Sequence, residues 1–122
     1  MPKVAIVIPA RMASTRFPGK PLEKILGISM IQHIYSRVQM CRNVSSIVIA
    51  TCDKEIINAS KKFGAQAVLT SKKHKRSVDR VAEAVKKIDC DIVINLQGDE
   101  PLVTPEIIDK LITVMIEEKE IY

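Results

Sequence analysis

Four short aliphatic runs alternate with stretches of helical periodicity along the chain, and this alternation constrains the fold more than any other feature. The runs lie at Lys3–Ile8, Ile47–Thr51, Ala65–Leu69 and Asp91–Leu96. The first run is continuous and β-branched, a pattern that is typical of a strand buried on both faces of a parallel sheet, and the second run is also of a buried type. We therefore predict an α/β fold in which helices cover a mainly parallel sheet.

The stretches between these runs carry apolar residues at helical spacing. We predict a first helix from Ser29 that Asn43 and the serines after Val44 close, and a second helix that Asp53 caps and Gly64 ends. A third helix is predicted along Val78–Ile88, and a fourth begins at Thr104 and Pro105. Ligands of such folds bind at the carboxyl ends of the strands, so the loops that follow the strands matter most.

Size and composition narrow the class of protein. A chain of 122 residues suits a single domain, which we expect to span residues 1–122. The net charge of +5 suits an anionic ligand, either a nucleotide or a nucleic acid. Aromatic residues make up only 3% of the chain, so it lacks stacking platforms for single strands, and nucleic-acid binding ranks last.

The cysteines and the apolar segments bear on the compartment. Cys41, Cys52 and Cys90 are far apart and have no metal-binding spacing, so we expect reduced thiols. No secretory signal and no stretch approaching the ~20 apolar residues of a membrane-spanning helix is visible. We expect a cytoplasmic protein with no membrane partner.

The loop after the first strand, within Ile6–Pro21, carries three cations. They are Arg11, Arg16 and Lys20, with Gly19 beside the last of them. Cations can neutralise phosphate oxygens, arginine through two hydrogen bonds at once, and glycine permits close backbone approach. The loop matches neither the P-loop pattern nor GxGxxG. From the residues alone, a polyphosphate site and a solvated basic loop have equal weight.

Two further loops carry charged residues. Gln97–Pro101 (QGDEP) follows the fourth strand, where Asp99 is a candidate Mg²⁺ ligand and Glu100 could bond to backbone amides. A plain Gly-Asp turn is the alternative, which the neighbouring cationic loop makes less favoured. The basic run Lys72–Arg76 either contacts a nucleotide or acidic sugar, or is solvated. Arg80 either points into the cleft or pairs with a neighbouring carboxylate.

Two segments together carry a family resemblance. PARMASTRFPGKPL at Pro9–Leu22 and NLQGDEPLVTPEII at Asn95–Ile108 resemble the signatures of the 3-deoxy-manno-octulosonate (Kdo) cytidylyltransferases, the CMP-Kdo synthetases. MIQHIYSRV at Met30–Val38 and IATCDKEI at Ile49–Ile56 are similar to the pattern of the same family. The similarity covers essentially the whole chain. The first signature alone would also admit related transferases.

The resemblance implies a fold, a reaction and a set of site residues. The fold is a Rossmann-like, GT-A-like three-layer sandwich. The reaction transfers CMP from CTP to Kdo, with Mg²⁺ as cofactor and pyrophosphate as the second product, for lipopolysaccharide synthesis. The implied roles are as follows: Arg11, Arg16 and Lys20 bind the triphosphate, Pro9 and Ala10 lie near the cytosine, Arg80 contacts the base, Gln97 contacts the sugar, and Asp99 binds the metal. Arg11, Lys20 and Asp99 form the implied catalytic set.

The chain departs from the family pattern in two respects. Arg76, Ser77 and Val78 stand where the family usually has Ser, Gly and Thr, and they are expected to crowd or re-aim a segment that contacts base and ribose. Family members are also about twice as long, and they form homodimers through the half that is missing here. An apparently truncated sheet is expected to have an unpaired edge and an exposed apolar patch. A non-catalytic remnant that keeps the fold and binds at most a nucleotide or a partner is the alternative reading.

Overall fold

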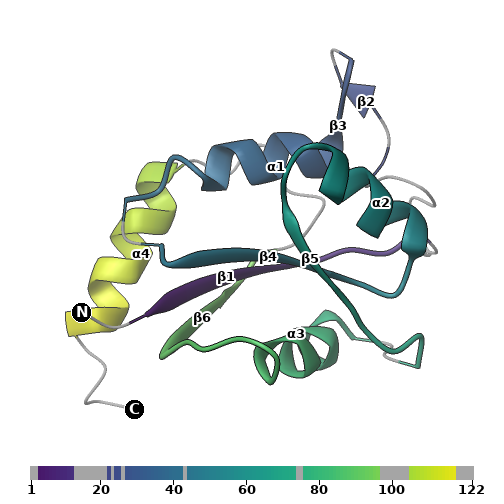
Figure 1. The fold of residues 1–122 in the computed structure, drawn as a ribbon. Helices are drawn as coiled ribbons and strands as arrows, with labels where there is room; N and C mark the ends of the chain where they lie inside the picture. The colour runs from purple at the N-terminus through teal and green to yellow at the C-terminus, as the bar shows by residue number, and fades with distance from the viewer. Residues whose placement is uncertain are drawn as a thin grey trace.

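Four parallel strands form the main sheet of the protein (Figure 1). The computed structural model describes residues 3–12, 22, 24–25, 27–42, 44–73, 76–96 and 105–117. The strands are β1 (Val4–Pro9), β4 (Ser46–Thr51), β5 (Gln66–Leu69) and β6 (Ile92–Asn95), in the order β5-β4-β1-β6. The predicted α/β fold with a mainly parallel sheet is confirmed.

Strand β1 is a central strand of this sheet. It pairs with β4 on one side, from Ala5 opposite Ser46 to Pro9 opposite Ala50, and with β6 on the other side. Every residue of β1 is buried. A strand covered on both faces needs apolar side chains in both directions, which explains the unbroken apolar run in its sequence.

Helices cover the two faces of the sheet unequally. The helices are α1 (Met30–Val38), α2 (Lys54–Lys62), α3 (Ser77–Val85) and α4 (Pro105–Glu117). Ile6 and Ile8 of β1 pack in one cluster with residues of α1, α2 and α4. Val7 points the other way and packs with Val81 and Ala84 of α3. The result is a three-layer arrangement, with α1 and α2 on one side of the sheet and α3 on the other (Figure 1).

The ends of the first two helices confirm some expectations and correct another. The Ser29 hydroxyl accepts a hydrogen bond from the Gln32 amide at 3.3 Å, and Gly64 ends α2 with a φ of 82°. Helix α1 ends at Val38, so the prediction that the serines after Val44 close it is wrong. Ser45 instead braces the start of β1: its amide donates to the Val4 carbonyl at 2.7 Å, and its hydroxyl accepts from the Val4 amide.

A short antiparallel hairpin was not predicted. Its strands are β2 (Lys24–Ile25) and β3 (Ile28–Ser29). Gly27 lies between them with a φ of 83°, a conformation that glycine adopts readily. Strands of two residues carry too little alternation to be recognised in a sequence. The hairpin stands away from the main sheet at the top of Figure 1.

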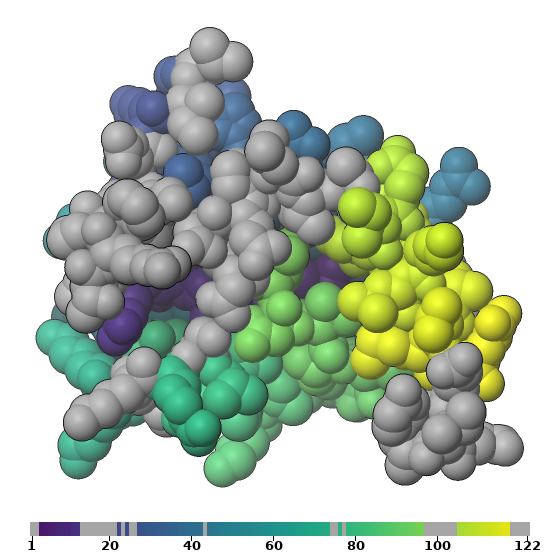
Figure 2. All heavy atoms as spheres, turned by 180° about the vertical axis from the view of Figure 1, so that it is seen from behind, coloured from purple at the N-terminus to yellow at the C-terminus, as the bar shows by residue number. Residues whose placement is uncertain are grey.

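The outer face of α4 carries three exposed apolar side chains. Ile107, Leu111 and Val114 are 63%, 46% and 41% exposed, respectively, while Ile108 and Ile112 face the core. Figure 2 shows α4 in yellow at the surface, beside the green segment that contains β6. Among the described residues, β6 pairs with β1 alone. These observations agree with the expected unpaired edge and exposed apolar patch.

None of the helices in the described part of the chain combines the length and the apolar character needed to cross a membrane.

Candidate functional site

The carboxyl ends of the four parallel strands meet at one edge of the sheet, which we call the carboxyl edge. The strands end there at Pro9, Thr51, Leu69 and Asn95. The described residues that follow them are Ala10–Met12, Cys52–Asp53, Thr70–Lys73 and Leu96. Open α/β sheets bind ligands at this edge, so it is the candidate functional site.

The end of β1 is held firmly up to Met12. Ala10 is buried, and its amide donates to the carbonyl of Ala50 in β4 at 3.0 Å. Arg11 follows with an intermediate exposure. The Met12 amide then donates to Oδ2 of Asp53 at 2.8 Å. The backbone on both sides of Arg11 is therefore hydrogen-bonded to β4 or to the residue that leads into α2.

Arg80 of α3 crosses to the same edge. Its side chain is buried, with only 3% exposure. Its Nε donates to the Thr70 hydroxyl at 3.0 Å, and its Nη2 lies 3.5 Å from the Ser71 carbonyl oxygen and 3.8 Å from the Cys52 sulfur. The Ser71 amide in turn donates to Oε1 of Glu83 at 3.0 Å. Arg80 thus joins the ends of β4 and β5 to α3.

The two alternatives for Arg80 can be compared with these contacts. The acidic neighbour Asp79 bonds to Arg76 instead, at 3.1 and 3.2 Å. The hydrogen bonds described for Arg80 go to a hydroxyl, a carbonyl and a thiol at the edge of the sheet. Arg80 therefore reaches the carboxyl edge, and a contact with a base remains a prediction.

A chain of polar contacts connects these elements. The Cys52 thiol lies 3.8 Å from Oδ2 of Asp53, the same oxygen that accepts the Met12 amide. Nη2 of Arg80 lies 3.8 Å from the same sulfur. The end of β1, the end of β4 and the start of α3 are therefore linked through Cys52 and Asp53. A substitution in one of these elements is therefore expected to alter the hydrogen bonds of the others.

A hollow of about 540 Å³ opens at the ends of β4 and β5. It is lined by Cys52, Asp53, Lys54, Glu55, Leu69, Thr70 and Lys72. Two lysines and two acidic residues are among these lining residues, so residues of both charges border the hollow at the ends of β4 and β5. Lys72 belongs to the basic run singled out in the sequence, and Lys73 beside it is exposed.

The structure describes part of the predicted site. Pro9, Ala10, Arg11 and Arg80 all lie at or reach the carboxyl edge. Arg16, Lys20, Gln97, Asp99 and the basic-run residues His74 and Lys75 lie outside the described residues. Within the described ranges, no group of three metal-ligating side chains gathers at one place. The predicted magnesium ligand Asp99 is outside those ranges, so Mg²⁺ binding stays a prediction.

The sequence predictions missed the role of the residues after β4. Asp53 is the N-cap residue of α2, as predicted, but its side chain makes no capping hydrogen bond. The predicted capping interaction is wrong, because the Asp53 carboxylate accepts a hydrogen bond from the Met12 amide instead. Thr70 was not singled out at all. The signal that could have found Asp53 and Thr70 is their position just beyond the carboxyl ends of β4 and β5.

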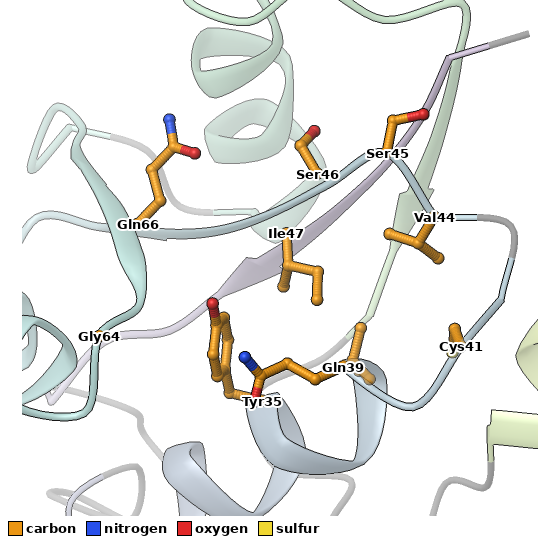
Figure 3. A pocket seen from close by; sticks show the side chains of 10 residues that line it. Tyr35, Gln39, Cys41, Val44, Ser45, Ser46, Ile47, Gly64 and Gln66 are labelled. Atoms are coloured by element: carbon orange, nitrogen blue, oxygen red, sulfur yellow. The ribbon is translucent and has the colours of Figure 1, made fainter.

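The opposite, amino-terminal edge of the sheet has a different character. A hollow of about 370 Å³ there is lined by Tyr35, Val38, Gln39, Cys41, Val44, Ser45, Ser46, Ile47, Gly64 and Gln66. Figure 3 shows side chains of α1 and of the starts of β4 and β5 around it. None of these lining side chains is a cation, so this hollow lacks the charge that a triphosphate requires.

The described groups with a displaced pKa also lie at the amino-terminal edge. Burial, followed by the charges of Asp109 and Glu106, raises the pKa of the Cys41 thiol to about 11. The hydrogen bond with Asp89 raises the pKa of Lys3. Burial also raises the pKa of Cys90. All three cysteines are free thiols, as predicted.

Comparison with known proteins identifies the family. A family model described as cytidylyltransferase matches residues 5–122. The chain is 44% identical to the 3-deoxy-manno-octulosonate cytidylyltransferase of Geobacter metallireducens over 119 residues, which cover 98% of the chain and 47% of that protein. It is 44% identical to the protein of the same name from Escherichia coli over 112 residues, which cover 92% and 46%.

Solved structures agree with this match. A structure of CMP:2-keto-3-deoxy-manno-octonic acid synthetase complexed with CTP superimposes with a TM-score of 0.93 at 42% identity, covering 96% of this chain and 48% of that one. A cytidylyltransferase from Leptospira borgpetersenii superimposes with a TM-score of 0.86 at 27% identity, covering 96% and 50%. The chain spans about half the length of the curated relatives it matches. The chain therefore belongs to the cytidylyltransferase family, in which it corresponds to the N-terminal half of the 3-deoxy-manno-octulosonate cytidylyltransferases.

Proposed function

We propose that this chain is the nucleotide-binding half of an enzyme that transfers CMP from CTP to Kdo and releases pyrophosphate. One structural observation carries the proposal. The residues Pro9, Ala10 and Arg11, which the family resemblance assigns to the nucleotide, follow one another at the end of the central strand, where the sheet can bind a ligand. The relatives that carry this activity by name are 44% identical over nearly the whole chain.

In this proposal the cations bind the triphosphate of CTP. Arg11 lies at the carboxyl edge between two backbone anchors. Arg16 and Lys20 follow in the same loop of the sequence and supply further positive charge. Guanidinium and ammonium groups stabilise phosphate oxygens through charge-assisted hydrogen bonds. Pro9, Ala10 and Arg80 are proposed to face the base, and Gln97 the sugar.

The reaction would be an in-line substitution at phosphorus. The anomeric hydroxyl oxygen of Kdo forms a bond to the α-phosphorus of CTP while the bond from that phosphorus to the bridging oxygen breaks. Pyrophosphate leaves with the bonding electrons, and the hydroxyl proton is lost. Such a transfer depends on positioning and on charge stabilisation by fixed cations, which is what Arg11 and Lys20 are proposed to provide.

Magnesium enters the proposal through Asp99. A carboxylate together with phosphate oxygens is the donor set that Mg²⁺ prefers, and the bound ion would neutralise charge on the phosphates.

Arg80, Thr70 and Ser71 form a hydrogen-bonded group at the carboxyl edge. In the proposed complex this group holds the ends of β4 and β5 in place around the nucleotide.

A thermal-shift titration with CTP and Mg²⁺ tests the binding half of the proposal. A ligand that binds only the folded state must raise the melting temperature as its concentration rises above Kd. We expect a rise with CTP and a smaller rise with ATP, whose purine is larger than cytosine. An unchanged melting temperature at millimolar CTP would contradict nucleotide binding by this chain.

Release of pyrophosphate from CTP and Kdo tests the catalytic half. Turnover that Asp99→Ala abolishes would support the enzyme and reject a non-catalytic remnant. Asp89→Ala is the matched control, because Asp89 is an exposed aspartate that bonds to Lys3 at the amino-terminal edge. CTP binding without any pyrophosphate release would reduce the function of this chain to nucleotide binding alone.

A further inference from the structure

Asp53 makes a contact that its position in the fold does not require. It is the N-cap residue of α2, where an aspartate ordinarily accepts a hydrogen bond from an amide of the first helical turn. Its side chain makes no such bond. Its Oδ2 instead accepts the Met12 amide at 2.8 Å, 41 residues away in the sequence. The Asp53 carboxylate therefore accepts a hydrogen bond from the segment after β1 rather than from the first turn of α2.

The carboxylate of Asp53 is itself held in position. The Asp53 amide donates to the Thr51 hydroxyl at 3.1 Å, and Thr51 is fully buried. The Cys52 thiol lies 3.8 Å from the same Oδ2 that receives the Met12 amide. Asp53 therefore presents its oxygen from a fixed backbone rather than from a free loop.

The bond from Met12 fixes the peptide group that directly follows Arg11. The Ala10 amide is fixed on the other side by the Ala50 carbonyl at 3.0 Å. With both neighbouring amides bonded, rotation of the backbone at Arg11 is restricted, and the direction in which its side chain leaves the sheet is set. An arginine whose base is fixed loses less freedom when it binds a phosphate, and this raises affinity.

The negative charge of Asp53 indicates that its hydrogen bond to the Met12 amide has a function. A carboxylate close to a bound triphosphate repels it, so Asp53 weakens nucleotide binding through its charge alone. Serine or asparagine can cap a helix without that charge. A carboxylate at this place is favoured only if its strong hydrogen bond to the backbone contributes more than the repulsion costs.

We propose that Asp53 is a positioning residue for Arg11: its hydrogen bond to the Met12 amide orients Arg11 toward the triphosphate of CTP. The proposal rests on the proposed function, because it takes Arg11 to be a triphosphate ligand. It adds a residue from the second strand-to-helix connection to a site that the sequence places in the first and fourth loops.

The chain contains a matched control at the other end of the same strand. Oδ2 of Asp91 accepts the amide of Lys3, just before β1, also at 2.8 Å. The two aspartates make the same kind of bond to the same strand, at opposite edges of the sheet. Asp91→Ser should therefore alter stability without altering nucleotide affinity, while Asp53→Ser should alter affinity.

Two substitutions of Asp53 separate capping from positioning. In Asp53→Ser the hydroxyl can cap α2, but it sits one bond closer to the backbone and no longer reaches the Met12 amide. In Asp53→Asn the amide oxygen keeps the reach and still accepts the bond. We expect Asp53→Ser to weaken CTP binding roughly tenfold and Asp53→Asn to stay within about threefold of wild type, measured by titration calorimetry with Mg²⁺.

A double-mutant cycle tests whether Asp53 acts through Arg11. In an Arg11→Ala background, Asp53→Ser should weaken CTP binding less than about twofold further, because the residue that it positions is gone. Equal affinity of Asp53→Ser and wild type would overturn the proposal. An undiminished effect in the Arg11→Ala background would overturn it as well, since Asp53 would then act by another route.

Hydrogen exchange separates failure of this proposal from failure of the proposed function. The Met12 amide should be protected in the wild-type chain and in Asp53→Asn, and should exchange faster in Asp53→Ser. If the wild-type chain binds no CTP, nucleotide binding is contradicted, but faster exchange in Asp53→Ser still upholds the positioning contact. Equal protection of the Met12 amide in all three proteins would overturn the contact and, with it, the proposal.

Discussion

The carboxyl and amino-terminal edges of the sheet both anchor β1 with an aspartate, but they surround it with different chemistry. Asp53 accepts the Met12 amide and Asp91 accepts the Lys3 amide, each at 2.8 Å. At the carboxyl edge the anchored segment contains Arg11, and the buried Arg80 approaches from α3. At the amino-terminal edge the hollow beside the strands has no charged lining.

This difference shows which features of a strand end are structural and which are functional. A backbone anchor occurs at both edges, so an anchor alone does not mark a ligand site. Lys3 at the amino-terminal edge is also a cation, but it pairs with Asp89. Arg11 and Arg80 lie at the carboxyl edge, where parallel sheets bind ligands. The anchored arginine, rather than the anchor, marks the proposed nucleotide site.

The largest expected effect comes from weakening β1 between its two ends. Ile6 is fully buried in the middle of the strand, so Ile6→Ala should lower the free energy of unfolding by about 2–5 kcal/mol. Both edges depend on this strand, and CTP binding should fall with stability. Ile107→Ala is the matched control, since Ile107 is 63% exposed on α4, and its effect should stay within about 0.5 kcal/mol. Urea unfolding of the two variants measures the difference. Equal losses of unfolding free energy would contradict the assignment of β1 as a central, buried strand.

Removing the cation at the carboxyl edge should impair binding more than stability. Arg11→Ala is expected to weaken CTP affinity by roughly 10–100-fold, because a charge-assisted hydrogen bond to phosphate is lost. Lys62→Ala removes an exposed cation from the end of α2 and should leave the affinity unchanged. Calorimetric titration compares the two variants. Equal affinities would remove Arg11 from the proposed site.

The Arg80 network should respond to loss of a hydroxyl. Thr70→Val keeps the shape of a buried side chain but removes the oxygen that receives Nε of Arg80. A buried donor left without its partner costs about 1–3 kcal/mol, so the free energy of unfolding should fall by that amount. Thr70→Ser retains the hydroxyl and should lose less. If the two variants unfold at the same urea concentration, the bond from Arg80 to Thr70 contributes no stability.

At the amino-terminal edge, we expect the Cys41 thiol to react slowly in the folded chain. Its pKa is raised to about 11 from the ordinary 9.0, so little thiolate exists near neutral pH. At pH 8 iodoacetamide should modify Cys41 roughly tenfold more slowly in the folded chain than in urea, because the thiolate is scarcer although each thiolate is more nucleophilic. Mass spectrometry of the Cys41 peptide measures the rates, and equal rates would contradict the burial of the thiol.

The same pKa shift has a consequence for stability. The folded chain keeps the Cys41 thiol protonated above the pKa at which the unfolded chain releases the proton. The unfolded state then binds fewer protons than the native state, so stability falls as the pH rises from about 9 to about 11. Cys41→Ala should remove this part of the decline. A decline of the same size in both proteins would show that other groups cause it.

The smallest effect is expected at the start of α3. Arg76 is the N-cap residue there and makes no side-chain capping bond, while it pairs with Asp79 at the surface. Arg76→Ser should raise the free energy of unfolding by about 0.5–1 kcal/mol, because serine can cap the helix and an exposed ion pair contributes little. Arg76→Ala loses the pair without gaining a cap and should not be stabilised. Equal melting temperatures of the two variants would show that serine does not cap α3.

Much of the fold could be predicted because its two central strands, β1 and β4, are largely buried. Val4 to Ile8 and Ile47 to Ala50 are unbroken apolar runs, and such runs have few other stable arrangements. The stripe of α1 was recognisable from Met30, Ile31 and Ile34 at helical spacing. The β2–β3 hairpin was not predictable, because a strand of two residues shows no periodicity.

The site was predictable only in part, because its contacts join residues far apart in the sequence. Arg11 could be singled out by its charge after a strand. The bond between Met12 and Asp53 spans 41 residues, and local propensity predicts a helix cap for Asp53 instead. The contacts of Arg80 with Thr70 and Cys52 likewise depend on how α3 packs across the ends of β4 and β5.

Chemical-shift mapping by NMR tests the central claim most directly, and a chain of 13.6 kDa suits the method. Titration with CTP and Mg²⁺ should shift the amide signals of Arg11, Cys52 and Thr70 at the carboxyl edge. The amide signals of Gln39, Ser46 and Gln66 at the amino-terminal hollow should remain in place. Shifts at the amino-terminal hollow, or no shifts at millimolar CTP, would contradict the assignment of the nucleotide site to the carboxyl edge.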